Sequence, residues 1–136
     1  MTRSFYTDNG WEGKNYDVNL NTKEIAKILR KELKVFSGCK WSITTTYNTI
    51  RINLMKAPCS PFVEEFDGNR GYIQLNHYYI DRDESLTEEA RKMFSDIVNF
   101  VQSFNYNDSD AQIDYFSTNF YLYVGIGKWD TEFEVA

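Results

Sequence analysis

The sequence predicts a single α+β domain, in which an antiparallel sheet of three to four strands carries two helices packed on one face. Two segments, 21–36 and 85–104, have apolar residues at helical spacing. Two others, 40–55 and 116–127, alternate apolar and polar residues as half-buried strands do. A length of 136 residues is common for one domain, so residues 1–136 are treated as one unit with the order α-β-β-(β)-α-β.

The first predicted helix follows a lead-in, residues 1–20, whose aromatic side chains need cover and therefore predict ordered chain. Asn21 is a suitable N-cap, because Glu24 stands three residues later at the spacing of a capping box. Gly38 ends the helix, since glycine adopts the left-handed conformation that often follows a helix. The apolar stripe between these ends consists of Ile25, Ile28, Leu29, Leu33 and Phe36.

The segment after this helix predicts a hairpin, because apolar and polar residues alternate on both sides of Asn48. Its turn contains no Asn-Gly pair, so the register stays open. Residues 56–61 contain both prolines of the chain and predict a loop. Residues 71–80 predict the third strand.

The second predicted helix begins at Ser85, with Glu88 completing another capping box. One broad face of this helix is apolar, which indicates a role in the core rather than in cofactor binding. That face consists of Leu86, Ala90, Met93, Phe94, Ile97, Val98, Val101 and Phe104. The last strand follows a loop and ends at Gly125 and Gly127.

The polar side of the first helix is the one concentrated basic feature of the sequence. It comprises Lys23, Lys27, Arg30, Lys31 and Lys34, with two glutamates between them. One interpretation is a solvated face supported by charge pairs at i,i+4 spacing. The other is a docking face for phosphate or for an acidic partner.

Residues 105–116, NYNDSDAQIDYF, place three aspartates between the second helix and the last strand. Counted from Asp108, a calcium loop needs glycine at its sixth place and glutamate at its twelfth, where this chain has Ile113 and Asn119. We therefore predict no metal site and no cofactor. Asn, Asp and Ser favour turns, which predicts a structural loop. Its members are Asn105, Tyr106, Ser109, Asp110, Asp114 and Tyr115.

No complete catalytic set is recognisable in the sequence. Cys39, Cys59 and His77 have no CxxC or metal-ligand spacing, and we expect free thiols, although Cys39 and His77 could meet as nucleophile and base. We predict that the protein is not an enzyme, with a metal-dependent hydrolase using the acids of 108–114 as the enzymatic alternative. Several tyrosines could stack nucleobases, but few Lys or Arg flank them. These are Tyr72, Tyr78, Tyr79, Tyr121 and Tyr123.

The net charge of −5 and the pI near 4.9 argue against a general nucleic-acid binder, which needs a basic surface. They are compatible with a local basic patch, and with an acidic surface that occupies a basic groove of another protein. The sequence starts without an apolar signal segment and contains no run of about 18 apolar residues. We therefore expect a cytoplasmic protein that does not bind membranes.

Several motifs resemble one family, the twenty-ninth type of large polyvalent protein-associated domain, found in phages and conjugative elements of Gram-positive bacteria. IAKILRKELK and the following WSIT resemble its first helix and strand. LNHYYI, LTEEA and NYNDSDAQIDYFSTNFYLYVGIGKWDTEF are similar to its C-terminal signature of N-Y-x-x-S-D, D-Y-F, N-F-Y and I-G-x-W. The resemblance covers residues 14–133.

The resemblance implies a mobile-element protein that helps the element after transfer, for example by countering host defence. It implies no catalytic residue. We therefore expect first a non-enzymatic binding protein with a protein partner, such as an acidic inhibitor. The alternative is a nucleic-acid-binding accessory protein that uses the basic face of the first helix.

Overall fold

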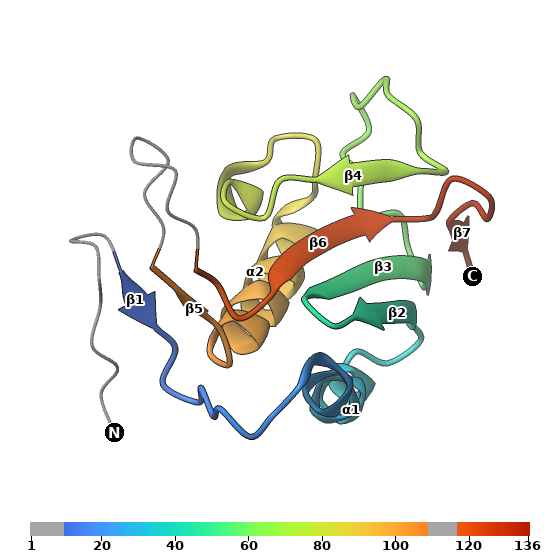
Figure 1. Cartoon of the computed structure of the whole chain (residues 1–136). Coiled ribbons are helices and arrows are strands. Elements are labelled where there is room, and N and C mark those ends of the chain that lie inside the picture. Colours follow the sequence, from blue (N-terminus) through green and yellow to red (C-terminus); the bar gives the residue numbers. More distant parts are fainter. Residues whose placement is uncertain (1–9, 109–116) are drawn as a thin grey trace.

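The computed structural model describes residues 10–108 and 117–136, which form two α-helices, two short 3₁₀ helices and several strands (Figure 1). The helices are α1 (Thr22–Glu32), η1 (Leu33–Val35), η2 (Ile80–Arg82) and α2 (Glu88–Gln102). The strands are β1 (Trp11–Glu12), β2 (Lys40–Thr46), β3 (Thr49–Ala57), β4 (Ile73–Leu75), β5 (Tyr106–Asn107), β6 (Tyr121–Ile126) and β7 (Glu134–Val135). The predicted α+β class is confirmed.

The main sheet is mixed, with the strand order β2-β3-β6-β4 and with β7 paired to β3. The β2–β3 hairpin is antiparallel and sets Thr46 opposite Thr49, whereas β3 and β6 run parallel. The prediction of an antiparallel sheet is therefore wrong at its centre. The chain between β3 and β6 contains α2, and a helical crossover of this kind returns the chain to the end where the first strand began. Alternation along a strand carries no information about its direction.

One face of the main sheet is buried and the other is open. The buried residues of the two central strands stand beside one another across the sheet. They are Ile50, Ile52, Leu54, Leu122, Val124 and Ile126. Both helices pack into the same core, with Ile25 and Leu29 from α1 and Phe94 and Val101 from α2. Full burial of one such side chain contributes about 1.5–3 kcal/mol, so this face holds the fold together.

The two helices begin with different caps. At α1, the Glu24 N–H donates to Asn21 Oδ1 (2.9 Å) and the Asn21 N–H donates to Glu24 Oε1 (3.3 Å), so the predicted capping box is confirmed. α2 begins after Thr87, whose Oγ1 accepts a backbone N–H of the first turn. The predicted start at Ser85 is wrong, because the Ser85 hydroxyl and N–H both donate to Asp83 Oδ1 (2.6 and 3.0 Å).

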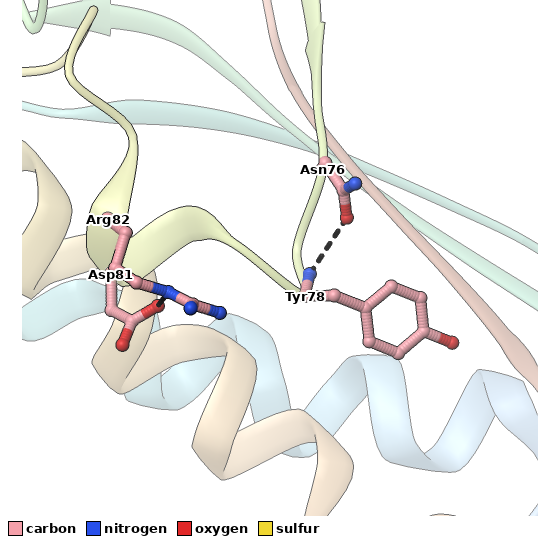
Figure 2. A network of polar contacts seen from close by, with 4 residues as sticks. All are labelled: Asn76, Tyr78, Asp81 and Arg82. Atoms are coloured by element: carbon pink, nitrogen blue, oxygen red, sulfur yellow. Dashed lines mark hydrogen bonds and ion pairs between the residues drawn. The ribbon is translucent and has the colours of Figure 1, made fainter.

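The predicted third strand, 71–80, is shorter than expected, since β4 ends before Asn76. The Asn76 Oδ1 accepts the Tyr78 N–H (3.0 Å) and closes a turn. Figure 2 shows this turn leading into η2, where Arg82 Nε lies 3.6 Å from the Asp81 carboxylate. Asparagine favours such bonds between side chain and nearby backbone, and these end the strand despite its alternating sequence.

The described part of the lead-in, residues 10–20, is ordered against the end of α2. β1 pairs antiparallel with β5. The Gly13 N–H donates to the Asn105 carbonyl (2.8 Å), and the Asn15 N–H donates to the Ser103 carbonyl (2.8 Å). A Cβ at Gly13 would collide with the Ser103 carbonyl, so the close approach requires glycine.

Gly127 joins the end of β6 to a tight turn. Its φ of +69° lies in the left-handed region, and a Cβ there would collide with the Gly71 carbonyl. The Gly127 N–H donates to the Leu54 carbonyl (2.8 Å), and the Gly127 carbonyl accepts from Asn53 Nδ2 (2.9 Å). These contacts fix the turn to the main sheet.

We expect Gly127→Ala to lower the free energy of unfolding clearly more than Gly38→Ala. Both glycines have positive φ, +69° and +79°, so left-handed strain of about 1–2 kcal/mol applies to each. Only at Gly127 does the added methyl group meet backbone, because Gly38 faces the ring of Pro58. Urea unfolding of the two variants measures the difference, and equal losses would contradict this account of the turn.

Candidate functional site

The open face of the main sheet carries polar and aromatic side chains. Because side chains alternate along a strand, Arg51 of β3 and its neighbour Tyr123 of β6 share this face. Asn53 and Gln74 flank Gly125 on the same side. The Arg51 guanidinium lies over the Tyr123 ring, with Cζ 4.4 Å from the ring centroid, which is a cation–π arrangement.

A hollow of about 350 Å³ lies over this face, and we call it the sheet hollow. It is lined by Thr44, Arg51, Asn53, Tyr72, Lys128, Trp129 and Asp130. The turn after Gly127 supplies three of these residues. In that turn the Lys128 N–H donates to the Thr131 carbonyl (2.8 Å), and the Thr131 N–H donates to the Lys128 carbonyl (3.2 Å). The tip of the turn presents Trp129, whose side chain is 83% exposed.

The five basic residues predicted on the first helix, Lys23, Lys27, Arg30, Lys31 and Lys34, are all exposed on α1 and η1. At 100° per residue, the four within α1 span an arc of about 100° and form one face. Arg30 Nη2 donates to the Ile43 carbonyl of β2 (3.3 Å). The basic face therefore extends to the edge strand of the main sheet.

A second hollow, of about 480 Å³, lies between the end of α1 and β2, and we call it the edge groove. Arg30 and Lys34 supply its charge, while Phe36, Cys39 and Trp41 are among its apolar lining residues. Trp41 Nε1 is buried and makes no hydrogen bond within the described part of the chain. The edge groove combines cationic and aromatic groups.

Exposed glutamates gather elsewhere, where the loop after β3 meets the start of α2. The Val63 N–H donates to the Ser85 carbonyl (2.9 Å), and the Thr87 N–H donates to the Pro61 carbonyl (2.8 Å). These bonds hold two acidic segments beside each other. Their exposed glutamates, Glu64, Glu65, Glu84, Glu88 and Glu89, are called the acidic end.

The predicted structural loop is described only in part. Ser109, Asp110, Asp114 and Tyr115 lie outside the described residues. The Asn105 side chain is 4% exposed, and its Nδ2 donates to the Phe120 carbonyl (3.0 Å) and to Gln102 Oε1 (2.8 Å). Its Oδ1 accepts the N–H groups of Phe120 (3.2 Å) and Tyr106 (2.9 Å). Asn105 thus links the end of α2 to the start of β6.

The hydrolase alternative relies on the acids of 108–114, of which the structure describes Asp108. Asp108 is 1% exposed, and its N–H donates to the Ser117 carbonyl (2.7 Å). Within residues 10–108 and 117–136, no three His, Cys, Asp or Glu side chains are grouped as a metal site. The hydrolase alternative therefore stays a prediction from the sequence.

Cys39 and His77 do not form the nucleophile–base pair considered from the sequence. Cys39 precedes β2 and His77 follows β4, which are the opposite edge strands of the main sheet. Burial and the nearby Cys59 thiol raise the pKa of Cys39, and burial lowers the pKa of His77. A raised thiol pKa is the opposite of what an activated nucleophile needs. Cys39 and Cys59 are both free thiols.

The sequence interpretation missed Arg51, Lys128 and Trp129. It considered the tyrosines of the open face but found few cations near them along the chain. The parallel register supplies the missing cation by setting Arg51 beside Tyr123. Two features of the sequence were visible in advance: a glycine directly after a strand at Gly127, and a tryptophan two residues later.

Comparison with protein families gives a match that covers most of the chain. The model of a family described as Large polyvalent protein associated domain 29 matches residues 20–119, a range that contains both α-helices and the β2–β3 hairpin. Searches of curated proteins and of solved structures each found no match. In the part of the chain that the structure describes, no helix has the length and apolar character needed to cross a bilayer.

We expect Asn105→Ala to lower the free energy of unfolding by about 1–3 kcal/mol, because it leaves buried backbone groups of two segments without their partner. Asn99→Ala is the matched control, since Asn99 is exposed on α2 and its loss should change stability by less than about 0.5 kcal/mol. Chemical denaturation measures both variants. A stable Asn105→Ala protein would argue that this loop serves a site instead of the fold.

Proposed function

This chain belongs to the family of large polyvalent protein associated domain 29, a family of phage and mobile-element proteins, and on this premise we propose that it is a non-enzymatic binding protein. Its basic end, defined as α1, η1 and the β2–β3 hairpin, binds a polyanionic macromolecule of the element or of its host. The partner we favour is nucleic acid.

The observation that carries this proposal is the segregation of charge along the chain. Residues 22–57 contain eight Lys and Arg and two Glu, which gives a net charge of +6. All other residues together contain seven Lys and Arg and 18 Asp and Glu, which gives a net charge of −11. The basic segment folds into neighbouring elements, because α1 packs on the hairpin (Figure 1).

The basic end has the properties that phosphate binding needs. Four of its lysines and arginines are exposed on one face of α1, so a backbone of phosphates can approach several of them together. Neutralising phosphates releases condensed counterions, which favours binding at low salt. Arg30 is held in place by its bond to the Ile43 carbonyl, so less side-chain freedom is lost when it binds.

A second candidate function rests on the acidic end. Five exposed glutamates are held side by side by the backbone bonds between residues 61–63 and 85–87. Such a surface is complementary to a basic groove, and occupying that groove would block the nucleic-acid binding of another protein. This is the acidic inhibitor expected from the composition.

For the first candidate, we expect Lys27→Glu/Lys31→Glu to weaken binding to a labelled duplex DNA and to reduce the slope of log K against log salt by about two. The control is Lys14→Glu/Lys92→Glu, which changes the net charge equally at exposed lysines outside residues 22–57. Fluorescence anisotropy between about 50 and 200 mM salt measures both. Absence of binding at low salt, or equal weakening by the control, would overturn the proposal.

For the second candidate, we expect Glu64→Lys/Glu65→Lys to abolish retention of a host protein that the wild type captures at moderate salt. Both glutamates lie in an exposed loop, so the fold should tolerate the change. The Lys27→Glu/Lys31→Glu protein is the control and should still capture that protein. If the acidic-loop variant retains the same protein as the wild type, the inhibitor function is excluded for this surface.

A further inference from the structure

We infer that the open face of the sheet is a stacking surface for single-stranded nucleic acid, centred on Trp129 and Tyr123. This inference rests on the proposed function, because the basic end supplies the attraction for phosphates. It adds the class of nucleic acid, the surface that holds the bases and the residues that do so.

A group of exposed aromatic rings lies on this face. Tyr72, Tyr121 and Tyr123 are 36%, 46% and 36% exposed, although each belongs to the main sheet or borders it. Tyr121 and Tyr123 are alternate residues of β6 and therefore lie about 6.6 Å apart along one face. Every base has a π-face, so rings in such a row can stack successive bases without regard to sequence.

The position of Trp129 on the surface does not contribute to folding in an evident way. Its side chain makes little contact with the molecule, yet the turn that carries it is held by the Lys128–Thr131 bonds and by the Gly127 contacts. A rigid support presents a large ring to solvent at the rim of the sheet hollow. The backbone that carries this ring is therefore already ordered before a flat ligand binds.

The other residues of the face supply hydrogen-bonding groups for nucleic-acid bases. Here the aromatic rings are interspersed with hydroxyl and amide side chains, which can hydrogen-bond to base edges. They are Ser42, Thr44, Thr46, Thr49, Asn53 and Gln74.

Cations are placed where a phosphate backbone would pass. Arg51 lies over the Tyr123 ring, and Lys128 lines the sheet hollow. Only β2 separates that hollow from the edge groove, since Thr44 lines the one and Ile43 lines the other. A nucleic-acid strand that crosses β2 therefore passes from the lysines of α1 to the aromatic rings of the open face.

Among the described residues, Asp130 is the one acid lining the sheet hollow, and its carboxylate opposes a phosphate backbone there. This provides a test that damage to the fold would not imitate. Asp130→Asn keeps the size of an exposed turn residue and removes the opposing charge. It should therefore increase affinity for a single strand, whereas a structural defect would lower it.

The experiment measures binding of a fluorescein-labelled oligothymidylate of about 12 nucleotides, with a duplex of the same length as comparison. Trp129→Ala should weaken binding of the single strand about tenfold or more, because one stacking contact is lost. The control is Tyr79→Ala, since Tyr79 is 57% exposed beside η2, outside the basic end, and lines neither hollow. Binding of the duplex should not change in Trp129→Ala, because paired bases cannot stack on the ring.

Three outcomes are distinguishable. Weakened single-strand binding in Trp129→Ala, tighter binding in Asp130→Asn and unchanged binding in Tyr79→Ala would support the inference. A different result would be weaker binding in Lys27→Glu/Lys31→Glu alone, by the same factor for the single strand and for the duplex. In that case the inference is overturned and the proposed function stands. If the wild type binds neither probe at low salt, both are overturned.

Discussion

The parallel pairing of β3 with β6 is the constraint on which the rest of this structure depends. β3 is hydrogen-bonded to β2, β6 and β7, and its register with β6 sets Ile52 beside Val124. That register turns the aliphatic residues of both strands toward the helices. A slip of β6 by one residue would expose its aliphatic residues to solvent and turn Tyr123 into the core. The hydrophobic pattern therefore specifies the register strongly.

The same register divides the molecule into a face that stabilises the fold and a face that is free for binding. Both helices cover the aliphatic side, so the open side contributes little apolar burial. Its tyrosines and Trp129 remain partly or largely exposed, and substitutions there should affect binding more than folding. Asn105 and Gly127 have the opposite character, because each fixes backbone at one end of β6.

Local features of the fold could be predicted from the sequence, whereas pairings between distant segments could not. The stripe of α1 and its Asn21 cap depend on residues within a few positions, and both are confirmed. The direction of β6 depends on the crossover through α2, and the early end of β4 depends on Asn76 bonding its own turn. The candidate site follows the same rule. The residues of the basic face lie on one helix, so the sequence predicts them together. The contact of Arg51 with Tyr123 exists only because two distant strands pair.

A net charge of −5 is compatible with nucleic-acid binding in this molecule, because the distribution of charge matters more than its sum. Electrostatic screening at physiological salt acts over about 8 Å, so a phosphate at one edge of the sheet responds mainly to the charges of that edge. At the β2 edge these are the cations of residues 22–57. In the proposed complex, the acidic end would disfavour binding elsewhere on the surface, which would confine the nucleic-acid strand to the β2 edge and the open face. Salt should therefore weaken binding in proportion to the few phosphates held there, and the acidic end should change that slope little.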